Sequence, residues 1–75
     1  MYTGDIVIHI DEELDNDRVH DLEREIGDEH GVYSACMLQK TRHLMVVDFD
    51  AMEVRPSGIV QAVRCHGLHA QMVGM

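Results

Sequence analysis

Histidine is the residue type that stands out by number, because the 75-residue chain contains six. Imidazole is the commonest protein ligand for metals and changes its charge near neutral pH. Together with carboxylate or single-thiol donors, it suits Zn, Ni or Co better than Cu(I), which prefers paired thiolates. We identify five candidate metal ligands, namely His9, Glu12, Cys65, His66 and His69. The alternative is that these are ordinary polar residues of a solvated sheet face and a helix end, where histidine suits the helix dipole.

The two cysteines, Cys36 and Cys65, lie far apart in the sequence and form no Cys-x-x-Cys pair. This spacing indicates neither a disulfide framework nor a zinc ribbon, so we expect both thiols to be reduced. We expect Cys36 to be a small, partly buried strand residue. His20 and His30 should be surface residues away from any metal site.

The chain is acidic, with 14 Asp and Glu against six Lys and Arg and a formal charge of −8. Such a charge repels phosphate backbones and anionic lipids, so we predict neither a nucleic-acid partner nor membrane binding. The longest apolar stretch, residues 44–47, is too short to span a bilayer, and the first residues lack the features of a signal peptide. We therefore expect a cytoplasmic protein.

Alternating and β-branched runs predict four strands, over residues 6–10, 32–38, 44–49 and 68–73. The alternation slips once in the second run, which suggests a bulge. Two stretches of helical periodicity predict a helix that begins near residue 17 and a shorter one that begins at Pro56. The order strand-helix-strand-strand-helix-strand predicts one α+β domain over residues 1–75. Its fold would be a ferredoxin-like βαββαβ sandwich, a four-stranded antiparallel sheet with two helices on one face.

Several segments, spread over nearly the whole chain, resemble the heavy-metal-associated domain, the fold of copper chaperones and of the N-terminal modules of metal-pumping ATPases. They are residues 6–10, 31–32, 46–50, 59–63 and 67–70. The same register places the family's Met-x-Cys-x-x-Cys motif on residues 13–18. Asp15 and Arg18 then stand where the family has its two cysteines, and Leu68 where it has a tyrosine near the metal. The resemblance therefore implies the scaffold without the paired thiolates that select Cu(I).

In this topology the first loop, the turn at residues 39–43 and the turn before the last strand share one end of the sheet. We expect His9 and His69 to be cross-strand neighbours there, close enough to share a metal. The acidic residues of the first loop have another interpretation, because Asp15, Asn16 and Asp17 are typical helix N-caps.

The face of the sheet that the helices leave open should carry Val7, Leu44 and Val46, with Leu38 or Cys36 from the second strand. An apolar patch on an acidic chain favours a protein interface, either of a homodimer or with an unknown partner. The alternative function is therefore a metal-free interaction or dimerisation domain. Scattered surface valines would need no such explanation.

Catalysis is the function class that the sequence supports least. It has no evident nucleophile–base pair and no glycine-rich phosphate loop, so we predict that the chain is not an enzyme. The same fold serves acylphosphatase, which binds phosphate in its first loop, but here that loop is acidic and would repel an anion. RNA binding on the sheet would need several stacking aromatic residues and a basic surface, whereas the chain has only three aromatic residues and is acidic.

Overall fold

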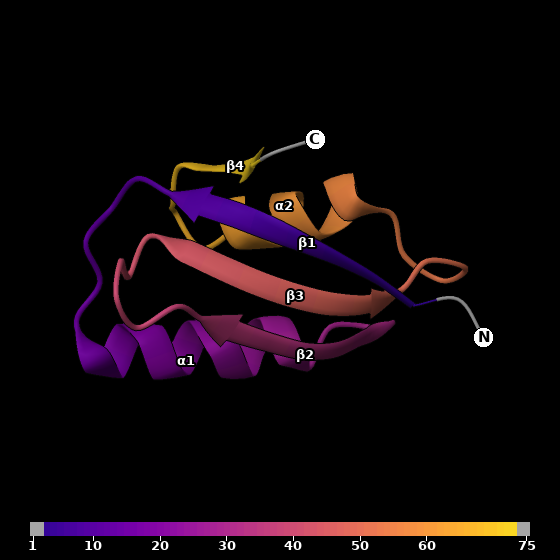
Figure 1. The fold of residues 1–75 in the computed structure, drawn as a ribbon, viewed down its shortest axis with the longest axis horizontal. Coiled ribbons are helices and arrows are strands. Elements are labelled where there is room, and N and C mark those ends of the chain that lie inside the picture. The colour runs from indigo at the N-terminus through magenta and orange to yellow at the C-terminus, as the bar shows by residue number, and fades with distance from the viewer. Residues whose placement is uncertain (1–2, 74–75) are drawn as a thin grey trace.

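The structure, a computed structural model, describes residues 3–73. Its elements follow the order β1 (Thr3–Ile10), α1 (Asn16–Gly27), β2 (Val32–Met37), β3 (Leu44–Asp50), α2 (Pro56–Arg64) and β4 (Ala70–Val73). The strands form one antiparallel sheet in the order β2-β3-β1-β4. Both helices cover the same face of this sheet (Figure 1). The predicted ferredoxin-like α+β fold is confirmed.

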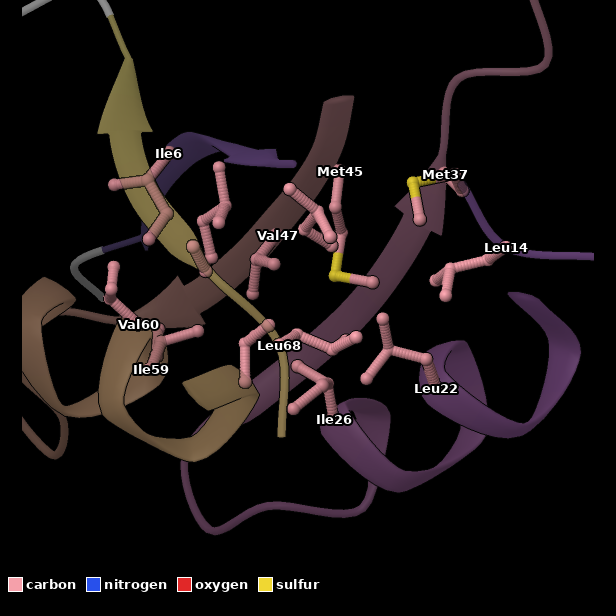
Figure 2. Packing of buried hydrophobic residues seen from close by; sticks show 14 of the residues in the cluster. Ile6, Leu14, Leu22, Ile26, Met37, Met45, Val47, Ile59, Val60 and Leu68 are labelled. Atoms are coloured by element: carbon pink, nitrogen blue, oxygen red, sulfur yellow. The ribbon is translucent and has the colours of Figure 1, made fainter. Parts of the chain in front are cut away.

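Alternation along the strands separates a buried face from an open face. In β1, Ile6, Ile8 and Ile10 are buried, whereas Val7 and His9 between them remain partly exposed. The buried face packs on apolar side chains of both helices, as Figure 2 shows for Ile26 of α1 and Ile59 and Val60 of α2. The core is almost entirely aliphatic, because Phe49 is its one aromatic residue among those described.

Both helices begin where the sequence predicts. The carboxylate of Asp15 accepts a hydrogen bond from the backbone N–H of Arg18 at 2.8 Å, which caps α1. Pro56 occupies the first turn of α2, where its fixed φ suits the helix and its missing N–H costs no hydrogen bond. The predicted cap and the predicted first-turn proline are therefore confirmed.

Strand boundaries differ from the prediction by more than one residue at two places. β1 begins at Thr3 rather than at residue 6, because residues 3–5 also pair with residues 48–50 of β3. β4 begins at Ala70 rather than at Leu68, which lies buried after the positive-φ turn at Gly67 (φ 81°). The expected bulge is present, since the β2–β3 register shifts between Val32 and Ser34.

Three loops meet at one end of the sheet, on the left in Figure 1. The N–H of Ile10 donates to the carbonyl of His43 at 2.7 Å, and the N–H of Asp11 donates to the carbonyl of His69 at 2.9 Å. The side chain of Arg42 also donates to that of Asn16, which joins the β2–β3 turn to the start of α1. We call this end, formed by residues 9–16, 38–44 and 65–71, the histidine end. Its assembly from three loops is as predicted.

None of the described helices combines the length and the apolar character that crossing a membrane requires.

Candidate functional site

His69 and Glu12 form a two-point polar contact at the histidine end. The Nδ1 atom of His69 lies 2.5 Å from Oε2 of Glu12, while Oε1 of the same carboxylate accepts the backbone N–H of His69 at 2.9 Å. An ionised carboxylate only accepts hydrogen bonds, so Nδ1 of the imidazole carries the hydrogen. Nε2 of His69 takes no part in this contact, and its side chain is 82% exposed.

This contact changes the acidity of both groups. The hydrogen bond from His69 is the main reason that the pKa of Glu12 is lowered from its usual 4.5. The hydrogen bond to Glu12, followed by the carboxylate's charge, raises the pKa of His69 from its usual 6.5. The contact therefore favours the charged form of each partner.

His43 is oriented in a similar way by the backbone. Its Nδ1 lies 2.8 Å from the carbonyl oxygen of Ile10, which can only accept, so Nδ1 is the donor. The neutral ring therefore carries its lone pair on Nε2. His43 also stacks on His9, with ring centroids 5.9 Å apart and planes inclined by 16°. Two imidazoles thus lie side by side where β1 ends and β3 begins.

In contrast to His43 and His69, His9 makes no hydrogen bond through its Nδ1 atom. Its Nδ1 lies 3.1 Å from Oδ1 of Asp11, but the two atoms are not oriented for a hydrogen bond. Among residues 3–73, the Nδ1 atom of His9 is the one buried side-chain polar atom without a hydrogen-bond partner. The contact with Asp11 is therefore an electrostatic one and not a hydrogen bond.

The predicted pairing of His9 with His69 is wrong in register. His9 lies opposite Leu44 in β3 and opposite Gln71 in β4. His69 comes before β4 and meets Asp11 through its backbone carbonyl. The reason is that the Gly67 turn delays the start of β4, so the two histidines are diagonal neighbours rather than direct partners.

Among the described residues, Cys65 and His66 make no polar contact with the other candidate ligands. Cys65 caps the C-terminus of α2 as an exposed free thiol. Nδ1 of His66 lies 3.0 Å from Oε2 of Glu25, so this imidazole joins α2 to α1. Within residues 3–73, no group of three or more His, Cys, Asp or Glu side chains is placed to hold one metal ion. The described part of one chain therefore offers pairs of donors.

The segment that aligns with the family's metal motif has structural roles here. Leu14 is buried in the core, and Asp15 caps α1. Arg18 stands at the second cysteine position, and its guanidinium is not a metal ligand. The cap interpretation of the acidic loop is thus confirmed for Asp15.

His20 and His30 also pair with carboxylates. Nδ1 of His20 lies 3.6 Å from Oε1 of Glu23 on the same helix, and Nε2 of His30 lies 2.9 Å from Oε2 of Glu53. Both imidazoles are well exposed, at 78% and 80%. The prediction that they are surface residues is confirmed.

The open face of the sheet carries a contiguous group of apolar side chains. Val7 lies opposite Val46 in β3 and opposite Val73 in β4, while the N–H of Leu38 donates to the carbonyl of Leu44. Leu38 is 42% exposed and Val73 is 38% exposed. We call these five residues the apolar strip. The register of β1 and β3 places three of the predicted interface residues, Val7, Leu44 and Val46, along this face, and Cys36 lies opposite Val46. Leu38 follows β2 and also lines a hollow with Asn16 and Val19 of α1.

His43 is the residue at this end that is not among the candidate ligands predicted from the sequence. The signal was present, because His43 immediately precedes the third predicted strand at the end where His9 lies. The strand register could not be predicted from the sequence. It places Leu44 opposite His9, and the neighbouring His43 stacks on the His9 ring.

No protein-family model and no curated protein matches the sequence. Solved structures do match in fold. The copper-binding domain of HMA7, a P-type ATPase, has a TM-score of 0.84 at 17% identity and covers 93% of both chains. Oxidized MerP from Ralstonia metallidurans CH34 has a TM-score of 0.82 at 17% identity, covering 95% of this chain and 97% of that one. The apo copper chaperone of Enterococcus hirae has a TM-score of 0.81 at 25% identity, covering 91% and 98%.

The prediction that the chain is not an enzyme agrees with these matches, which include a copper-binding domain and a copper chaperone. The sequence resemblance to the heavy-metal-associated scaffold is matched by the structure over nearly the whole described chain. The two cysteines, however, are far apart and unpaired. The chain has the ferredoxin-like fold of copper chaperones and heavy-metal-associated domains, without their Cys-x-x-Cys motif.

Proposed function

We propose that the chain is a small metal-binding module that binds a divalent transition metal through imidazoles of the histidine end. The observation that carries this proposal is the orientation of His43 and His69. Each directs its Nδ1–H to an oxygen, Ile10 carbonyl or Glu12 carboxylate, and so leaves Nε2 as the donor for a metal. Proteins commonly fix the tautomer of metal-binding histidines with such a second hydrogen bond.

The donor set indicates the metal. His9 and His43 are adjacent imidazoles, and His69 lies on the same end with Glu12 as its orienting carboxylate. Imidazole nitrogen suits Zn, Ni and Co, whereas Cu(I) is selected by thiolates. Cys65 and His66, which lie at the end of α2, are weaker candidates because His66 is joined to Glu25.

The test is thermal unfolding with Zn²⁺, Ni²⁺, Co²⁺ and Cu(I) added in turn. A ligand at a hundredfold excess over its Kd stabilises the native state by about 2.7 kcal/mol, so a bound metal should raise the midpoint clearly. His9→Ala or His43→Ala should abolish the rise, and His69→Ala should reduce it. His20→Ala and His30→Ala, outside the histidine end, are the matched controls. The proposal fails if no metal shifts the midpoint, or if the controls lose as much as the site variants.

A second function is favoured by the apolar strip, namely a metal-free interaction or dimerisation domain. Val7, Val46 and Val73 lie side by side across three strands on a chain of net charge −8. Contiguous exposed apolar area on a charged surface is typical of a protein interface. A dimer that forms in the presence of a chelator and is lost in Val46→Glu would favour this function over metal binding.

The two free cysteines and the net charge bear on where the chain acts and on which partners it binds. We propose a cytoplasmic module, since the unpaired Cys36 and Cys65 suit a reducing compartment. The charge of −8 argues against nucleic acid or an anionic membrane as the partner. Binding to either would be expected only with a local basic patch, and the chain has only six Lys and Arg.

A further inference from the structure

The described part of a single chain brings too few metal ligands together for a closed zinc site. Structural zinc sites have four ligands in tetrahedral arrangement. Residues 3–73 contain no group of three or more potential ligands placed for a metal, and His9 and His43 form a pair. A zinc ion at this pair would need donors from elsewhere.

The histidine pair is continuous with the apolar strip. Leu44 is the register partner of His9 and the chain neighbour of His43, and Val46 and Val7 are the next open-face pair along the same two strands. A protein that packs on the apolar strip would therefore also lie over the imidazoles of His9 and His43.

Resting on the metal-binding function proposed above, we propose that two copies of the chain share one Zn²⁺, each contributing His9 and His43, with their apolar strips packed face to face. Two pairs of imidazoles complete the tetrahedral set that one chain lacks. The same association removes the apolar strip of each copy from water.

The position of the pair in the sheet suits a second copy. β3 and β1 are the two central strands of the order β2-β3-β1-β4. A two-fold axis that runs between them, parallel to the strands, places His9 over the Leu44 of the second copy, next to that copy's His43. It also places Val7 over the second copy's Val46, as a self-complementary interface requires.

The negative charge of the two copies explains why a metal ion would be needed for them to associate. Asp5 and Asp48 are register partners on the same open face, and each copy carries a net charge of −8. The two copies therefore repel each other, whereas Asp11, 3.1 Å from the His9 ring, favours a cation at the histidine pair. A divalent ion offsets part of this repulsion. The association should thus depend on the metal.

Sedimentation at increasing Zn²⁺, combined with a titration of bound metal, tests the inference. We expect a monomer in chelator, a dimer with zinc, and one zinc for two chains at saturation. Co²⁺ in the same site should give the strong visible absorption of a tetrahedral ion. His43→Ala should remain monomeric with zinc, and His20→Ala should dimerise like the unmodified chain. Asp48→Asn, which removes a repelling charge, should dimerise at lower zinc.

The outcomes separate this inference from the proposed function. Zinc bound one to one by a monomer would overturn the shared site and leave the metal-binding function standing. A dimer that forms equally in chelator would also overturn it. A failure to bind zinc at all would overturn both proposals. Val46→Glu is a second variant that leaves the imidazoles intact, and zinc-dependent dimers of a folded Val46→Glu chain would contradict the packing of the two strips.

Discussion

The two faces of the sheet use the same strands for different purposes. Ile6, Ile8 and Ile10 of β1 point into the core, which contains no buried polar or charged residue among those described. Val7 and His9, between them, point to the open face with the histidine pair and the apolar strip. Solved structures share this fold at 17–25% identity. Because the buried face carries no polar residue among those described, any metal chemistry must lie on the open face or at the histidine end.

Neighbouring residues of β3 give the sharpest contrast between the faces. Met45 is fully buried, and Val46 beside it points to the open face. A domain of this length has a stability of about 4 to 11 kcal/mol, and an isolated buried charge costs several kcal/mol. Met45→Glu should therefore prevent folding, as circular dichroism would report, and Val46→Glu should leave the monomer folded. Equal loss of structure in both variants would contradict the two-face description.

A milder form of the same comparison uses β1. Ile8 is 0% exposed, and Ile8→Ala should cost about 2 to 5 kcal/mol through lost burial and the cavity left behind. Val7→Ala, on the open face of a monomer, should cost well under half as much. Urea unfolding of both variants in chelator gives the two free energies. Comparable losses would mean that the open face is covered even without metal.

The first loop offers a test of structural against metal-binding carboxylates. Asp15→Ala removes the cap of α1 and should cost about 1 kcal/mol. Because the carboxylate acts as a cap, the zinc-induced rise in melting temperature should be the same in Asp15→Ala as in the unmodified chain. Asp15→Asn, which retains a capping oxygen, is the matched control. Loss of the zinc effect in either variant would make this residue a ligand.

The smallest expected effect is a pH dependence from the His69–Glu12 pair. The lowered pKa of Glu12 means that its contribution is present above 4.5 and is lost as pH falls through the folded-state pKa. The raised pKa of His69 means that its contribution is complete below 6.5 and is lost as pH rises through the folded-state pKa. The pair therefore stabilises the chain most between pH 4.5 and 6.5.

Glu12→Gln should accordingly lower the melting temperature within that window and have less effect at higher pH, in buffers that contain a chelator. Because the side chain of His69 is 82% exposed, the difference should be small and should decrease with salt. Glu53→Gln, which faces His30 at the opposite end, provides the comparison. A Glu12→Gln curve parallel to that of the unmodified chain at all pH values would show that the contact contributes nothing.

The sequence predicted the fold because alternation and helical spacing are local properties. The strands, the Asp15 cap, Pro56 and the bulge in β2 all follow from residues a few positions apart. The site depends instead on register between distant segments. Glu12 and His69 are 57 positions apart in the sequence, and the turn at Gly67 decides which residue meets which.

The histidines as a group lie mainly beside carboxylates. Five of the six lie within 3.6 Å of a carboxylate oxygen, with Asp11, Glu12, Glu23, Glu25 and Glu53 as partners. In a chain with 14 acidic residues, composition alone does not predict which carboxylate lies beside each imidazole. His43 is the exception, because it donates to a backbone carbonyl.

Calorimetric titration of Zn²⁺ into the unmodified chain and into His43→Ala tests the central claim most directly. The change removes an imidazole whose Nε2 is left for a metal and whose ring stacks on His9. We predict saturable binding by the unmodified chain and by the His30→Ala control, and its loss in His43→Ala. Binding of equal strength in His43→Ala, or none in the unmodified chain, would contradict the claim that the imidazoles of the histidine end replace the missing thiolates.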